Sequence, residues 1–192
     1  MKRLLVPLLF AVCLSTSATA SVAPSQDVAT RILTKLRQLD LLNQILPVLL
    51  TKEQLAKLLP VIEKAREASK ATERIELDEL KKLEAKLDAD IKDAKEKGLV
   101  TAKERTSEYT RVLAALRKVR EIMVNDQLET VLKSVEETLD EGQIKAATNS
   151  IQNPGDKESK LTDRDKLRRW VGAVLLDPLS YDLLLDLKKK GG

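Results

Sequence analysis

Apolar residues recur along most of the chain at intervals of three and four, the spacing of one face of an α-helix. No clear alternating pattern of the kind that predicts β-strands is present. The first helical pattern spans residues 26–46, and Pro47 is expected to end or bend it. Its apolar face consists of Val28, Ile32, Leu36 and Leu39.

The second and third patterns predict two long helices. The second helix is expected to begin near Lys52, to kink at Pro60, and to stop at Gly98, a residue suited to a left-handed helix end. The third is expected to start at Thr101 with a capping box and to run to about Leu139. Similar lengths and a short turn predict an antiparallel hairpin. The predicted fold is therefore all-α, a long hairpin with shorter flanking helices.

A specific local signal stands at the start of the second helix. Thr51 can accept a hydrogen bond at the helix start, and the side chain of Gln54 can reach back to the backbone of Thr51. Leu50 and Leu55 are placed to pack on each other across this cap. The segment is therefore predicted to be a capping box with a hydrophobic staple.

A related signal follows the third helix. Asp140 can cap a fourth helix, Gln143 can reach back, and Leu139 and Ile144 can form the staple. Gly142 lies inside this first turn, where glycine costs helix stability. The alternative is that Gly142 only terminates the third helix.

The C-terminal part, residues 153–192, is predicted to be a loop followed by a helical segment. A helix is expected from Leu161 to about Leu176, and a short apolar stretch precedes the tail Lys188–Lys190. Two interpretations hold for its apolar side chains. They pack on the first helix or the base of the hairpin, or they form a surface for protein binding or dimerisation. The residues are Trp170, Val174, Leu175, Leu183 and Leu184.

The N-terminus has the three parts of a secretory signal peptide. Lys2 and Arg3 precede an apolar run of eleven residues, and Ala18-Thr19-Ala20 resembles a cleavage site. Residues 1–20 are therefore predicted to be removed on export. Lipidation at Cys13 is a minor alternative, because Val12 precedes it where Gly or Ala is usual. The predicted divisions are the signal peptide, a hairpin domain at residues 21–152, and the C-terminal part.

The composition excludes the residue types on which most catalytic sites depend. The chain has no histidine, and its one cysteine lies in the predicted signal peptide. No phosphate-binding glycine loop or nucleophile motif is present. We therefore expect a non-enzyme with no metal or cofactor. Without residues 1–20 the chain keeps 32 basic and 30 acidic residues, interspersed, with few aromatics. This balance argues against nucleic-acid binding.

The order of helices and motifs resembles the Spy/CpxP group of periplasmic stress proteins. That group has paired L-T-x-x-Q motifs flanking a helical hairpin. Leu50, Thr51 and Gln54 match the first motif in full, and Leu139 with Gln143 matches the second in part. The resemblance implies a dimeric, ATP-independent chaperone or a regulator of envelope stress. This chain differs in having one methionine after the signal and no histidine.

Three functions are consistent with the sequence. The first is an exported, periplasmic protein that binds unfolded clients or an envelope sensor, with secreted or envelope-associated locations as alternatives. The second is a structural or adaptor protein that docks through its C-terminal segment. The third is binding at a lipid surface through amphipathic helices, without stable membrane insertion. A homodimer is expected, because a single hairpin lacks a second packing layer.

Overall fold

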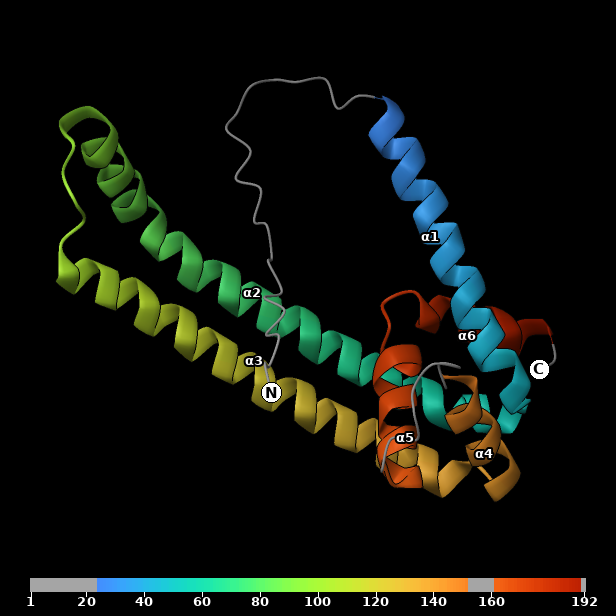
Figure 1. Ribbon diagram of the computed structural model, residues 1–192. Helices are drawn as coiled ribbons and strands as arrows, with labels where there is room; N and C mark the ends of the chain where they lie inside the picture. The colour runs from blue at the N-terminus through green and yellow to red at the C-terminus, as the bar shows by residue number, and fades with distance from the viewer. Residues whose placement is uncertain (1–23, 152–160, 191–192) are drawn as a thin grey trace, which may run out of the picture. The chain divides into compact units, whose positions relative to one another are not determined.

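A computed structural model describes residues 24–151 and 161–190, and every regular element in these ranges is helical (Figure 1). The all-α prediction is therefore confirmed. The predicted signal peptide, Cys13 and most of the predicted loop lie outside the described residues. The elements are α1 (Pro24–Ile45), η1 (Leu46–Val48), α2 (Lys52–Lys97), α3 (Lys103–Thr138), α4 (Glu141–Ser150), α5 (Asp163–Trp170), η2 (Val171–Leu175) and α6 (Ser180–Lys190).

The chain divides into two compact units, Met1–Arg37 and Gln38–Gly192. The described part of the first unit, residues 24–37, is the N-terminal part of α1. The second unit holds the rest of α1 and all other elements. Within the described ranges, no helix has the combination of length and apolar character that crossing a membrane requires.

The two long helices α2 and α3 pack as an antiparallel pair, as predicted (Figure 1). Helix α2 continues through Pro60 and ends before Gly98, whose φ of 65° lies in the left-handed region that glycine favours. The end of α2 therefore follows from local sequence.

The start of α3 differs from the prediction. The helix begins at Lys103, its N-terminal cap is Ala102, and no side chain accepts a hydrogen bond there. Thr101 lies one residue before that cap, so its predicted capping box with Glu104 does not form. The prediction was wrong because the turn after Gly98 is one residue longer than expected, and alanine has no oxygen with which to cap.

The second unit has a base, residues 38–66, 128–151 and 161–190, and an arm, residues 67–127. In the base, α4, α5, η2 and α6 gather around the open end of the hairpin (Figure 1). Trp170 is fully buried there, and its Nε1 donates to the carbonyl oxygen of Gln44 at 3.4 Å. Nearly all of the buried apolar residues, such as Leu41, Leu58, Leu132 and Leu184, lie in this core.

The arm is a two-helix layer, and polar contacts join its helices at intervals. The buried carboxylate of Glu76 accepts from Nε of Arg120 at 2.8 Å. Leu83 is the one large apolar side chain of the described arm that is buried. The other cross-contacts are Ser69–Gln127 at 3.0 Å, Lys86–Glu108 at 2.7 Å, Asp90–Tyr109 at 2.6 Å, and Asp90–Arg105.

Candidate functional site

The first capping box forms at the start of α2. The hydroxyl of Thr51 accepts from the backbone N–H of Gln54 at 3.2 Å, and Oε1 of Gln54 accepts from the backbone N–H of Thr51 at 3.0 Å. Leu50 and Leu55, the predicted staple residues, are both buried in the core of the base. The side-chain oxygen and the amide together satisfy two backbone donors that a helix start otherwise leaves free.

The second capping box has the same geometry at the start of α4. Oδ1 of Asp140 accepts from the backbone N–H of Gln143 at 2.8 Å, and Oε1 of Gln143 accepts from the backbone N–H of Asp140 at 3.1 Å. Leu139 is buried and Ile144 is half-buried. Gly142 lies inside α4, so the alternative in which it terminates the third helix does not hold.

The two boxes are joined to each other through their glutamines. Nε2 of Gln54 donates to Oε1 of Gln143 at 2.7 Å, and Nε2 of Gln143 donates to Oε1 of Gln54 at 3.0 Å. Each amide also donates to the backbone of the other box, Gln54 to the carbonyl of Thr138 at 3.0 Å and Gln143 to that of Leu49 at 3.2 Å. The arrangement is close to two-fold symmetric in its bonding.

This glutamine pair explains why the third position of each box is an amide. A glutamine has two N–H donors and an oxygen that accepts twice, and both side chains use all four. A glutamate could complete its own capping box but could not donate to the other one. The pair therefore links two helix starts that lie 89 residues apart in the chain.

A third capping box opens α5 without such a link. Thr162 and Asp165 form the reciprocal bonds, with the backbone N–H of Asp165 donating to the Thr162 hydroxyl at 3.1 Å. Hydrogen bonds from the side chain and backbone of Thr162 lower the pKa of Asp165. A carboxylate has no N–H to offer a neighbouring helix, so this box serves only its own helix.

The C-terminal apolar residues do not form an exposed contact surface. Trp170, Val174, Leu175 and Leu184 are fully buried, and Leu183 is half-buried and packs against the same core. The surface interpretation is therefore wrong for the first four, and packing on the base of the hairpin is what the structure shows. Because they complete the core, they cannot serve as the docking site of an adaptor in this fold.

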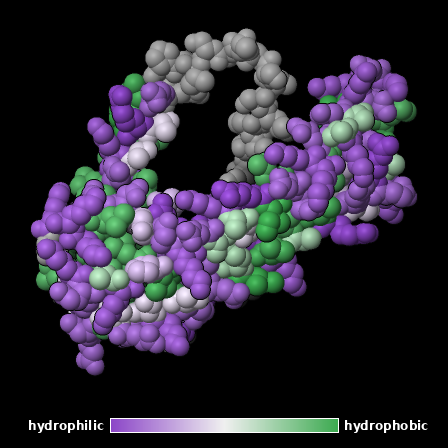
Figure 2. Space-filling view, turned by 180° about the vertical axis from the view of Figure 1, so that it is seen from behind, coloured by the Kyte–Doolittle hydropathy of each residue, from purple (hydrophilic) through white to green (hydrophobic). Residues whose placement is uncertain are grey.

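An apolar groove lies on α2 and α3 where the base meets the arm. Its volume is about 480 Å³. Figure 2 shows hydrophobic residues gathered over this part of the hairpin. Small side chains from α2 make the hollow, and larger ones from α3 form its opposite wall. The principal lining residues are Ala65, Ala68, Thr72, Val119, Ile122 and Met123.

Charged side chains border the groove. Lys64 on α2 and Asp126 on α3 line it, and both are exposed. The border thus carries one charge of each sign, so it has no net charge that would select a partner of one sign. Among the described residues, no group of three or more acidic, cysteine or histidine side chains is arranged to hold a metal ion.

Sequence reasoning missed this groove. Helical spacing along the sequence predicts that Ile75 lies on the apolar stripe of α2 and Val119 on the inner face of α3, but both side chains are exposed. Ile122 lies off the predicted inner face of α3 and lines the groove. A large apolar residue outside the packing stripe was the available signal of a second apolar face.

Comparison of the chain with protein-family models, with curated proteins and with solved structures gives no match.

Proposed function

We propose that this chain is an exported, non-catalytic protein that binds apolar segments of other proteins in the groove between α2 and α3. The observation that carries the proposal is the groove itself, an apolar hollow open to solvent on a helical pair. Binding would need no nucleotide, because the contact replaces water on apolar surface that is already exposed. Its work would be that of a chaperone or a stress-response protein.

The resemblance to the Spy/CpxP group supports this proposal. In that group paired motifs flank a hairpin, and here both motifs take part in the glutamine pair that closes the hairpin base. The pair joins the start of α2 to the end of α3. These two helices form the walls of the groove, so the pair would keep the walls in register. Exposed apolar side chains on two walls of this kind suit weak contact with many clients.

The proposal is tested by aggregation of a denatured exported protein, followed by light scattering with this chain at equal concentration. Suppression of aggregation is expected. Ile122→Asp places a charge in the groove wall and should remove most of the suppression, because a buried unpaired charge opposes apolar contact.

The matched control is Val124→Asp. Val124 is similarly exposed on the same helix but does not line the groove. Its variant should suppress aggregation as the parent does. Failure of the parent to suppress aggregation would sink the proposal, and equal loss in both variants would move the binding site away from the groove.

We also propose that the protein is a homodimer. The arm is a single layer of two helices, and it leaves large apolar side chains such as Leu77, Leu80 and Ile91 exposed. Such a layer is usually covered by a second one. Sedimentation equilibrium at micromolar concentration should show twice the chain mass, and a monomer there would contradict this state.

A further inference from the structure

The turn between α2 and α3 carries two apolar residues that no part of the fold requires. Val100 is 93% exposed and Leu99 is 53% exposed, although turns of this kind are usually built from polar residues and glycine. Gly98 provides the left-handed conformation, and Leu99 N–H donates to the carbonyl of Asp93 at 3.4 Å. The turn geometry therefore uses the backbone and leaves both side chains free.

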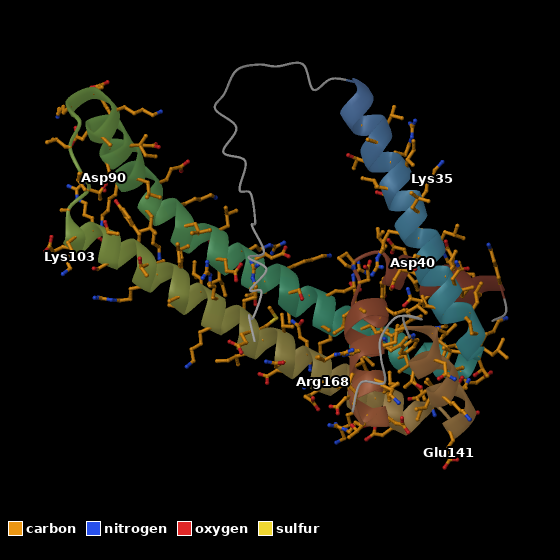
Figure 3. All side chains as sticks on the ribbon, viewed as in Figure 1. Lys35, Asp40, Asp90, Lys103, Glu141 and Arg168 are labelled. Carbon is orange, nitrogen blue, oxygen red and sulfur yellow. The ribbon has the colours of Figure 1, made fainter. Side chains whose placement is uncertain are left out.

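Lysines surround this apolar pair. Residues 95–103 contain three lysines and one glutamate, a net charge of +2. Lys97 pairs with Asp93 at 2.8 Å, whereas Lys95 and Lys103 have no ion-pair partner among the described residues. Figure 3 shows Lys103 at this end of the hairpin, far from Glu141 in the base. An apolar tip with free cations behind it is complementary to a surface with anionic headgroups over hydrocarbon.

The geometry of the arm isolates this tip. Helix α2 continues for 31 residues between Glu67 and Lys97, which is about 45 Å at 1.5 Å per residue. Contact at the tip would therefore leave the groove and the base in water. The tip is also independent of the glutamine pair and of the apolar core, which both lie in the base.

We propose that the turn Gly98–Ala102 binds an anionic lipid surface, with Leu99 and Val100 entering the interface and Lys95 and Lys103 facing the headgroups. The contact is peripheral, because two apolar residues reach only the boundary between headgroups and acyl chains. It differs from the protein-binding groove in residues, position and ligand.

The test is flotation of the full chain with vesicles of phosphatidylcholine, with and without about a quarter phosphatidylglycerol. Binding to the anionic vesicles is expected and should weaken at high salt. Leu99→Gln with Val100→Gln should lower the bound fraction about tenfold, since both the apolar insertion and its depth are lost. Lys95→Gln with Lys103→Gln should lower only the binding that depends on phosphatidylglycerol.

The control is Leu46→Gln with Leu49→Gln, which removes two exposed apolar side chains from the base. It should bind vesicles as the parent does. Equal binding by the parent and the tip variant would overturn the proposal. So would concentration-dependent association without vesicles that only the tip variant loses, because the tip would then dock on a second copy. Leu99→Trp gives a direct readout: its emission should shift to the blue on anionic vesicles, against the constant signal of buried Trp170.

Discussion

The base and the arm share the same two long helices, but different side chains join these helices in each region. In the base, residues such as Leu58, Leu132 and Trp170 are fully buried in one continuous core. In the arm, the helices meet through Ser69–Gln127, Glu76–Arg120 and similar polar contacts. Apolar burial is the larger stabilising contribution, and exposed polar contacts add little each.

This difference assigns separate tasks to the two regions. A cooperative core holds the base in one structure, whereas polar contacts set the register of the arm and leave apolar side chains available. The groove lies where the apolar core of the base gives way to the polar contacts of the arm. The base therefore supports one end of each groove wall. The apolar core that stabilises the fold and the exposed apolar surface are therefore placed at different points of one hairpin.

The largest effect is expected from Trp170→Ala. The side chain is fully buried, so its removal leaves a large cavity and should lower the free energy of unfolding by about 3–5 kcal/mol. Urea denaturation followed by circular dichroism measures the loss. Leu113→Ala in the arm is the contrast, because that side chain is partly exposed and should cost less than about 1 kcal/mol. Equal losses would remove the distinction between the regions.

The glutamine pair should give the next largest effect. Gln54→Ala leaves Gln143 with unmet hydrogen bonds in a partly buried site, at a cost of about 1–3 kcal/mol. Gln143→Ala should behave alike, and the double variant should cost less than the sum of both. Denaturant unfolding of the parent, the two single variants and the double variant gives the coupling energy between the two glutamines.

Gln54→Glu separates the cap from the link. Glutamate keeps the acceptor that serves Thr51 and suits a helix N-terminus, but it cannot donate to Gln143 or Thr138. A loss of stability in this variant therefore measures the link between boxes. If Gln54→Glu is as stable as the parent, the link contributes nothing and the capping box alone matters.

A smaller, local effect is expected from Arg120→Ala. It removes the partner of the buried Glu76 carboxylate and should cost about 1 kcal/mol, limited by the exposure of the arginine. Hydrogen exchange should quicken in the arm and stay unchanged in the base. Arg117→Ala, an exposed arginine on the same helix, is the control. Faster exchange throughout the base would show that the two regions unfold together.

Local sequence was sufficient to predict the helix ends that depend on neighbouring residues. Thr51, Gly98 and Asp140 each act within a few positions of themselves, so their roles are visible without the fold. The prediction of a capping box at Thr101 failed because it depends on the length of the turn. That length is set by how the two helices approach each other and not by the neighbouring residues. Local rules could not decide that geometry.

Contacts between segments that are far apart in the chain could not be predicted from the sequence. The periodicity of the C-terminal segment showed that Trp170 needed cover, but left the choice between packing and binding open. The glutamine pair could not be predicted either. Gln54 and Gln143 each already had a role in their own capping box, so nothing in the sequence indicated a second set of hydrogen bonds. Likewise, a two-helix arm buries only one narrow stripe, and which residues enter it depends on the rotation of each helix about its axis. Ile75 was therefore predicted to lie in the buried stripe, whereas its side chain is exposed.

The smallest effect concerns the isolated capping box of α5 and its dependence on pH. The pKa of Asp165 is lowered in the folded protein by hydrogen bonds from Thr162, below its ordinary value of 3.8. A lowered pKa means that the carboxylate stabilises the fold above the unfolded value, and that this contribution disappears as pH falls through the folded value. Asp165→Asn should therefore melt slightly below the parent at neutral pH, and the two should converge in acid. Melting temperatures between pH 2 and pH 7 measure this. A gap that persists at the acid end would mean that Asp165 acts through something other than its charge, and the third box would then resemble the other two more closely than its hydrogen bonds indicate.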